Sequence, residues 1–299
     1  MLIAGATPGA RAALAGTSAE PLPEGAPHPE CAARLCWNVV VAPRDLQALR
    51  AGARPVGVAV CSPEDLARAE RFLLRGLIKP TEGFMSRHFD RKISLAISRR
   101  LAGTRITPDQ MTILSVAIGV FGALFFLSAR PLLQTLGALC FVIHSIVDGC
   151  DGELARLRFQ ESRRGGLLDY WGDNLVHVAV FACLAIGWSL SVGAAWPLWL
   201  GASAILGTAG SAYFVYRTTM TAPREGPLFT SVVKTPDSVL SRAADALSRR
   251  DFIYLVLILS AFGKANWFLV LAAIGAPVFF LVLVGLAANE RTNRSRSVS

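Results

Sequence analysis

The 299-residue sequence lacks paired cysteines and an N-terminal signal peptide. Its six cysteines include no Cys-x-x-Cys pair, so a zinc site of the common spacing is not expected. We interpret Cys31 and Cys36 as reduced thiols or, alternatively, as a metal-binding pair. The first thirty residues are rich in Ala, Pro and Gly without a continuous apolar core. We therefore expect no cleavable signal peptide and membrane insertion through internal helices.

Charge is also scarce, because only 17% of the residues are charged whereas 53% are hydrophobic and the mean hydropathy is +0.46. An ordinary soluble domain is roughly 45–50% apolar. The composition therefore predicts a protein with several helices long enough to cross a bilayer. The six apolar spans lie near 109–128, 132–150, 166–188, 196–216, 251–263 and 266–288.

The fifth span is short for a full crossing, and it becomes adequate only if residues 238–250 continue into it as one helix. From Arg71 onward, the turns predicted on the outer side contain only Arg130 and Lys264, and every other Lys and Arg falls on the inner side. This asymmetry predicts a protein of the cell inner membrane with both termini in the cytosol. The net charge of +9 thus fits a membrane surface, and no nucleic acid partner is expected.

Residues 1–70 form the first predicted domain, a cytosolic segment that is partly disordered up to about residue 35. Residues 38–42 and 56–60 resemble two short strands around a helix at 45–51, which suggests a small α/β-like piece. Residues 71–299 form the membrane domain. It includes an amphipathic stretch, Phe84 to Leu101, that we interpret as an interfacial helix or, alternatively, as a solvated cytosolic helix.

Four carboxylates cluster between Asp148 and Asp173, at the edge of two apolar spans, where charge is unfavourable. If the helix that begins near Leu132 continues, Asp148, Asp151, Gly152, Ala155 and Arg156 share one face. Asp169 and Asp173 follow at i and i+4 on the next helix. Two antiparallel helices would then point four carboxylates into one gap.

Four like charges in one gap repel each other, and a divalent cation removes the repulsion. Carboxylate oxygens favour Mg²⁺, Mn²⁺ or Ca²⁺ over zinc. Gly152 and Ala155 leave room for a flat ligand near the helix backbone, and Arg156 can bind a phosphate with two hydrogen bonds. The cluster therefore predicts a site for a nucleotide diphosphate and metal ions.

The spacing Asp148-x-x-Asp151-Gly152-x-x-Ala155-Arg156, then eight residues, Gly165-x-x-x-Asp169-x-x-x-Asp173, resembles the signature of the CDP-alcohol phosphotransferases. The resemblance implies an all-α integral membrane fold and an enzyme with bound Mg²⁺ or Mn²⁺, as two ions. It implies that Asp148, Asp151, Asp169 and Asp173 bind the metal and that Asp173 is also the general base. It implies homodimers, which are common in the family.

The resemblance also implies a reaction in which an acceptor hydroxyl attacks the phosphorus nearer the alcohol of a CDP-alcohol and expels CMP. The residues that it assigns to the CDP group are Asp109, Thr112, Asp148, Gly152, Ala155, Arg156 and Ser162. Residues 107–112 can also be understood as an ordinary helix start. The acceptor, which can itself be phosphorylated, would bind to Arg217, Lys234 and Arg250. The general excess of Lys and Arg on the cytosolic side, or contact with lipid headgroups, also explains why basic residues occur at these positions.

The run from Gly76 to Phe84 resembles the linker before the membrane domain of di-myo-inositol-phosphate-phosphate synthases. Lipid-linked and soluble CDP-alcohols share the signature, so the identities of both alcohols stay open. His144 and His177 lie one turn before Asp148 and one turn after Asp173, where each is a core histidine or a partner of a carboxylate.

Two other functions compete with this interpretation. A membrane prenyltransferase also combines Mg²⁺ with a diphosphate, but it separates its acidic motifs over much of the chain. A divalent-cation transporter would favour acids near mid-membrane on several helices, whereas these acids lie at the predicted cytosolic helix ends.

Overall fold

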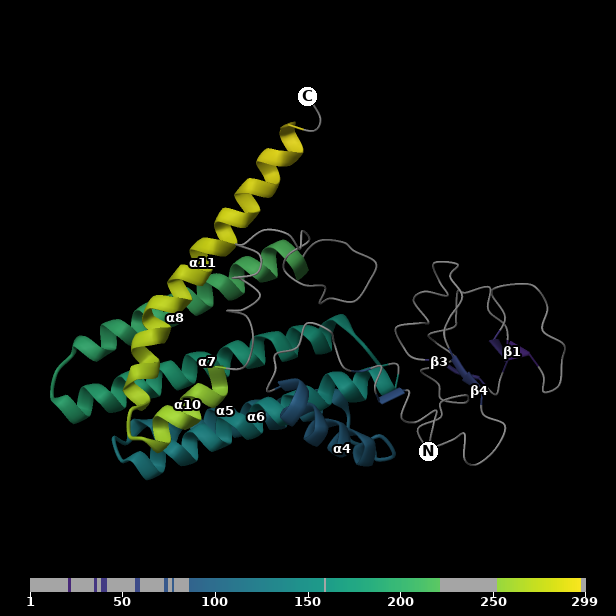
Figure 1. The fold of residues 1–299 in the computed structure, drawn as a ribbon, viewed down its shortest axis with the longest axis horizontal. Coiled ribbons are helices and arrows are strands. Elements are labelled where there is room, and N and C mark those ends of the chain that lie inside the picture. Colours follow the sequence, from purple (N-terminus) through teal and green to yellow (C-terminus); the bar gives the residue numbers. More distant parts are fainter. Residues whose placement is uncertain are drawn as a thin grey trace.

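The computed structural model describes residues 21–22, 35–36, 39–41, 57–59, 73–74, 77, 86–158, 160–220 and 252–296. Its main body is a bundle of long helices (Figure 1), as the sequence predicts. The helices are α4 (Arg91–Leu101), α5 (Pro108–Leu124), α6 (Pro131–Leu157), α7 (Arg163–Val192), α8 (Trp196–Val215), α10 (Phe252–Ala261) and α11 (Ala265–Arg296). Short π-helical or 3₁₀ turns adjoin three of them: η1 (Ser86–Asp90), η2 (Phe125–Leu127) and η3 (Tyr216–Met220).

Five helices of the described chain are long and apolar enough to cross a membrane. They are Pro108–Leu127, Pro131–Leu157, Arg163–Val192, Trp196–Thr218 and Ala265–Ala287. The predicted fifth span corresponds to α10, which has only 10 residues. Residues 221–251, which would have to lengthen it, lie outside the described residues, so a sixth crossing stays a prediction.

Four short strands are described in the N-terminal segment. Strands β3 (Val39–Val41) and β4 (Gly57–Ala59) pair antiparallel, and each falls inside a stretch that the sequence marks as a strand. Strands β1 (Pro21–Leu22) and β2 (Leu35–Cys36) pair in parallel. The helix expected at 45–51 lies outside the described residues, so the α/β character of this segment stays a prediction.

Glycines allow the membrane helices to approach closely. A Cβ on Gly119 of α5 would lie 2.6 Å from a methyl group of Val176 on α7, and one on Gly201 of α8 would lie 2.5 Å from the Cβ of Ala185 on α7. On α7, a Cβ on Gly187 would overlap the backbone of η2. Such contacts matter in a bilayer, where packing rather than the hydrophobic effect holds helices together.

The bundle buries a main apolar core and a smaller cluster of Met111, Cys150 and Leu154, and it leaves an apolar outer surface. Large side chains such as Trp199, Leu206 and Leu190 are more than 70% exposed, which suits helices surrounded by lipid tails. Among the described residues, the core side chains come from α5, α6, α7, α8, α10, α11 and η2. They include Phe126, Phe141, Val176, Val180, Phe181, Leu184, Val256, Phe268 and Leu269.

Helix α4 turns its polar side toward the bundle. Ser94 and Ser98 are buried, whereas Phe89 of η1 and Ile93 are 58% and 39% exposed. Lys92, Arg99 and Arg100 are exposed as well. An outer face that mixes apolar and basic side chains is typical of a helix in the headgroup region, which agrees with the interfacial interpretation.

A buried carboxylate on α6 holds the inner face of α4. Glu153 is fully buried and accepts hydrogen bonds from Arg91 (2.6 Å), Ser94 (2.7 Å) and Ser98 (2.7 Å). The three donors are spaced by three and four residues, so they share one face of the helix. This network explains why serines occupy the buried side of α4.

Gly187→Ala is expected to lower the stability of the bundle by about 1–3 kcal/mol, because the new methyl group meets backbone atoms of Phe126 and Leu127 that cannot rotate away. The measurement is the thermal unfolding midpoint in detergent. The control is Gly275→Ala on α11, where a Cβ would have no neighbour within 4 Å. Equal midpoints for the two variants would contradict the close packing of α7 against η2.

Glu153→Ala is expected to destabilise the protein by about 3–5 kcal/mol, because it leaves the partly buried guanidinium of Arg91 without its carboxylate. Glu161 is exposed in the turn after α6, and Glu161→Ala should change stability by less than about 0.5 kcal/mol. Denaturant unfolding followed by tryptophan fluorescence would show the difference. A Glu153 variant as stable as wild type would mean that the network does not hold α4.

Candidate active site

Three carboxylates of the signature meet between α6 and α7. Asp148 comes from α6, and Asp169 and Asp173 come from α7. One oxygen from each lies within 4.8 Å of the others. Asp148 is only 3% exposed, and the side chain of Asp173 is 19% exposed. The site therefore concentrates negative charge in a place with little water.

Local sequence explains how the three acids meet. Helix α6 continues past the predicted boundary at residue 150 and ends at Leu157, so the acids of the signature that precede Arg156 stay on one helix. Ser162 caps α7 by accepting a hydrogen bond from the backbone N–H of Gly165 at 3.0 Å. The short turn between the helices brings Asp169 and Asp173 back past Asp148.

The chemistry of these side chains fits a divalent cation. Two oxygens on opposite sides of a Mg²⁺ ion lie about 4 Å apart, since each Mg²⁺–O bond is roughly 2.1 Å. The spacing of at most 4.8 Å is close to that limit, and Mn²⁺ and Ca²⁺ also accept carboxylate ligands. Asp148, Asp169 and Asp173 can thus hold a metal ion, as the sequence predicts for them.

Asp151, the fourth predicted ligand, is not part of this group among the described residues. Its two oxygens accept hydrogen bonds from the hydroxyl of Thr112 on α5 and from the backbone N–H of Gly152. Of the four carboxylates expected to converge, only Asp148, Asp169 and Asp173 do so. The carboxylate of Asp151 is instead bonded to the Thr112 hydroxyl and the Gly152 backbone N–H. A metal-binding role for Asp151 stays a prediction.

Arg156 lies against the small residue one turn before it. A Cβ on Gly152 would lie 3.3 Å from the Nη1 atom of Arg156, so the guanidinium covers the Gly152 position. Ala155, beside Arg156, adds only a methyl group. Gly152, Ala155 and Arg156 are all partly exposed, so an anionic ligand can approach the guanidinium.

Two residues assigned to CDP lie together at the starts of α5 and α7. A Cβ on Gly165 would lie 3.2 Å from the Oδ1 atom of Asp109 and 3.1 Å from the Oγ atom of Ser162. Both Asp109 and Ser162 are exposed. Thr107 and Gln110 also form a full capping box at the start of α5, so the helix-start interpretation of this stretch is correct and a nucleotide role for Asp109 remains a prediction.

The acceptor residues are only partly described. Arg217 is exposed on η3, whereas Lys234 and Arg250 lie outside the described residues. Arg163 donates a hydrogen bond of 2.8 Å to the carbonyl of Met220. This bond places η3, and Arg217 with it, beside the start of α7.

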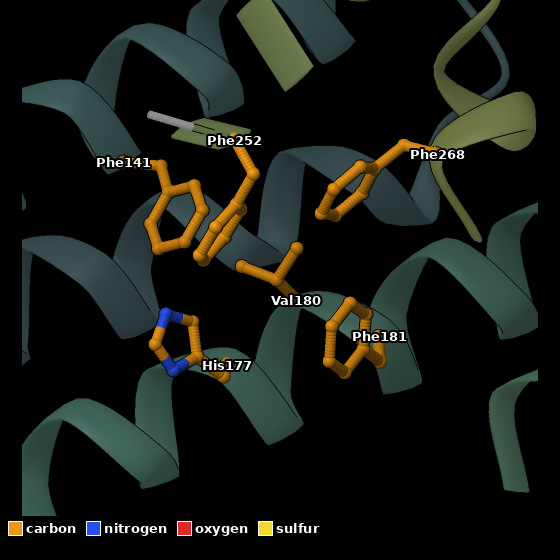
Figure 2. A pocket seen from close by; sticks show the side chains of 6 residues that line it. All are labelled: Phe141, His177, Val180, Phe181, Phe252 and Phe268. Carbon is orange, nitrogen blue, oxygen red and sulfur yellow. The ribbon is translucent and has the colours of Figure 1, made fainter. Parts of the chain in front are cut away.

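The two histidines occupy different environments. His144 is buried, and its Nε2 atom lies 3.5 Å from the Oδ1 atom of Asp173. His177 packs among aromatic rings in a small pocket (Figure 2), with ring centres 5.7 Å from Phe141 and 5.6 Å from Phe252. The other residues that line the pocket are Val180, Phe181 and Phe268. The partner role expected for either histidine is therefore best supported for His144.

Sequence reasoning missed the polar contacts that surround the site. Besides Glu153, Arg158 donates to the carbonyls of Leu101 (2.6 Å), Thr104 (2.9 Å) and Ile106, which closes the turn between α4 and α5. A glutamate inside an apolar helix is a signal that could have indicated buried donors. Arg91, Ser94 and Ser98 share one face of α4, and this spacing could have identified them as the donors.

The apolar helices and the acidic group together define an integral membrane protein with a candidate metal site between two of its helices. A profile of the family described as CDP-alcohol phosphatidyltransferase matches residues 105–288, more than half of the chain. The chain belongs to this family.

Similar curated proteins carry related names. A "Bifunctional IPC transferase and DIPP synthase" of Thermococcus kodakarensis is 39% identical over 127 residues, which are 42% of this chain and 28% of that protein. A "Phosphatidylinositol phosphate synthase" of Mycobacteroides abscessus is 33% identical over 110 residues, which are 36% of this chain and 49% of that protein. The chain thus spans between about a quarter and a half of the length of these relatives.

A solved structure is also similar. It is the phosphatidylinositol phosphate synthase of Mycobacterium tuberculosis with CDP-DAG bound, and it aligns with a TM-score of 0.47 and 21% sequence identity. The alignment covers 65% of this chain and 92% of that one.

Thr112→Val is expected to lower stability by about 1–3 kcal/mol, because it removes the hydroxyl that donates to the buried carboxylate of Asp151. Thermal unfolding in detergent measures the effect. Thr135→Val is the matched control, since the Thr135 hydroxyl bonds to the carbonyl of Pro131 in its own helix. An equal loss of stability in both variants would show that the Thr112–Asp151 hydrogen bond stabilises the protein no more than a hydrogen bond within one helix.

Proposed function

We propose that this chain transfers a substituted phosphate group from a CDP-alcohol to the hydroxyl of an acceptor alcohol and releases CMP. The observation that carries the proposal is the meeting of Asp148, Asp169 and Asp173, in a chain that belongs to the CDP-alcohol phosphatidyltransferase family. Arg156 lies two turns after Asp148 on the same helix. Family membership favours this reaction over prenyl transfer and over cation transport.

The reaction forms one P–O bond and breaks another. The acceptor oxygen attacks the phosphorus nearer the alcohol of the donor, its proton passes to the carboxylate of Asp173, and the bond to the CMP oxygen breaks. Asp173 is suited to this role because it belongs to the acidic group and its side chain is partly exposed, at 19%, so that an acceptor hydroxyl can reach it. CMP leaves as the second product.

The other residues bind and orient the donor. Arg156 would bind a phosphate oxygen pair, while Gly152 and Ala155 leave the space that the diphosphate needs. Asp109 and Ser162, which lie together beside Gly165, would contact the cytidine part. Thr112 would act through Asp151, whose carboxylate it holds. A bound divalent cation would supply charge neutralisation of the diphosphate in the transition state.

For the acceptor, we propose a phosphorylated alcohol of the inositol phosphate type. The names of the relatives, "IPC transferase and DIPP synthase" and "Phosphatidylinositol phosphate synthase", support this class. Arg217 fits this class as well, because η3, which carries it, is hydrogen-bonded to the start of α7, the helix of Asp169 and Asp173. Lys234 and Arg250 are proposed to add charge to the same region.

The finer points of the architecture belong to the same proposal. We propose six crossings, with α10 lengthened by residues before it, and an active site and termini on the cytosolic side of the inner membrane. Two metal ions, with Asp151 as a ligand of one of them, and a homodimer complete the proposal. Residues 1–70 would be a cytosolic segment of α/β type before the membrane domain of residues 71–299.

The test is CMP release by the purified protein with Mg²⁺, using CDP-diacylglycerol or CDP-inositol as donor and inositol, inositol phosphate or glycerol phosphate as acceptor. Product mass identifies the pair. Asp173→Asn should reduce the rate at least about 10²-fold, because a general base contributes roughly 10²–10⁴-fold. Asp169→Asn should weaken Mn²⁺ binding and activity together, since it removes a charged ligand.

The matched control for charge is Glu161→Gln, which removes an exposed carboxylate in the turn after α6 without touching the acidic group. Its activity should equal that of wild type. Absence of CMP release with every donor, despite intact Mn²⁺ binding, would overturn the proposed reaction.

A further inference from the structure

Arg158 lies within the signature stretch, but between its fixed positions, so the resemblance assigns it no role. It stands at the end of α6, where its backbone N–H donates to the carbonyl of Leu154 at 3.0 Å. Successive helical residues differ in direction by about 100°, so two residues turn the side chain by about 200°. Arg156 and Arg158 therefore point to nearly opposite sides of α6, and Arg158 must serve a different contact.

The Arg158 side chain holds the turn between α4 and α5. Its Nη2 atom donates to the carbonyl of Leu101 at 2.6 Å and to that of Thr104 at 2.9 Å, and its Nη1 atom donates to the carbonyl of Ile106. Leu101 is the last residue of α4, and carbonyls at a helix end need partners outside the helix. A guanidinium suits this place because it is always charged and carries five N–H donors in a rigid fork.

The start of α5 follows the position of this turn, since Ile106 directly precedes the residue that caps the helix. The Thr107 hydroxyl accepts a hydrogen bond from the N–H of Gln110 at 3.3 Å, and the Gln110 side chain accepts one from the N–H of Thr107 at 3.0 Å. Pro108, with its fixed φ, begins the helix. The first turn of α5, which contains Asp109, is therefore a rigid extension of the turn that Arg158 holds.

The first turn of α5 also lies close to the first turn of α7. A Cβ on Gly165 would lie 3.2 Å from the Oδ1 atom of Asp109 and 3.1 Å from the Oγ atom of Ser162. Glycine at this position thus lets the Asp109 carboxylate approach the start of α7. Asp109 and Ser162 are the two residues proposed to contact the cytidine part, and a shift of the α5 start would move one of them away from the other.

We propose that Arg158 is a positioning residue for the nucleotide end of the donor site: it ties the start of α5 to the end of α6 and so keeps Asp109 beside Ser162. This inference rests on the proposed function, in which these two residues bind the cytidine part of a CDP-alcohol. Because the acidic group belongs to α6 and α7 alone, Arg158 should affect nucleotide affinity more than the rate of the bound complex.

Two substitutions weaken the contacts of Arg158 to different extents. Arg158→Gln removes the charge and leaves one amide group, which is too short to reach the three carbonyls together. Arg158→Lys keeps the charge and can still donate, but an ammonium group lacks the fork that binds several carbonyls at once. Arg100→Gln is the control for loss of charge, because Arg100 is exposed on α4 next to Leu101.

The measurements are the dissociation constant for CMP by titration calorimetry in detergent with Mg²⁺, KM and kcat for the CDP-alcohol, and the thermal midpoint. Arg158→Gln should weaken CMP binding and raise KM about 10-fold, with kcat changed less than about 3-fold, because a misplaced Asp109 costs binding rather than chemistry. Arg158→Lys should lose less in both. Arg100→Gln should leave CMP affinity and KM unchanged.

A merely structural Arg158 would give a different pattern, in which the thermal midpoint falls while CMP affinity and KM stay near wild type. That result would overturn the proposal, as would an equal loss of CMP affinity in Arg158→Gln and Arg100→Gln, which would indicate a general effect of charge. If Arg158→Gln does not fold, the same comparison with Arg158→Lys decides.

Failure of the proposed function gives a separate result. If wild type releases no CMP from any donor but binds CMP, the proposed reaction fails, and CMP affinity alone decides the positioning role of Arg158. An affinity that falls in the Gln variant and falls less in the Lys variant would then support it. Wild type that neither releases nor binds CMP would overturn both proposals.

Discussion

The mutual repulsion of Asp148, Asp169 and Asp173 is the constraint on which the rest of the site depends. Their oxygens approach within 4.8 Å in a region with little water, where like charges interact more strongly than in solution. The fold sustains this arrangement by close helix packing on either side of it. Glycines at the α5–α7 contact, Gly119 and Gly172, allow these two helices to approach closely. The same charge concentration is what makes the site fit for a divalent cation.

A second layer of polar contacts surrounds the acidic group and gives each helix of the site a fixed register. Thr112 connects α5 to Asp151, His144 connects α5 and α6 to Asp173, and Glu153 connects α6 to α4. The contacts of Thr112 and Glu153 are buried, and the contact of His144 is partly buried. A buried polar group without a partner is strongly unfavourable. The helices therefore have few alternative arrangements that satisfy every contact. In this way α4, which lies at the bundle surface, is tied to the helix that carries the signature.

Membership of the CDP-alcohol phosphatidyltransferase family and the geometry of the site are two separate observations that point to the same helices. The family match rests on sequence over residues 105–288, whereas the convergence of the acids is a property of the folded helices. The two lines agree on α6 and α7 as the centre of the protein. They differ at Asp151. The signature includes this residue, whereas in the structure its carboxylate bonds to Thr112 and to the Gly152 backbone and lies outside the acidic group.

The sequence alone determined the helical membrane fold, the boundaries of most long helices and the helix face that carries the signature, because apolar length and 3.6-residue periodicity are local properties. It also predicted that Asp148, Asp151, Asp169 and Asp173 converge, and the structure brings three of them together without Asp151. Only the tertiary structure decided that Thr112 holds Asp151, that Glu153 receives Arg91, Ser94 and Ser98, and that His144 faces Asp173. These contacts join residues up to 62 positions apart in the chain. They depend on how the helices rotate and pack against one another, which no local pattern encodes.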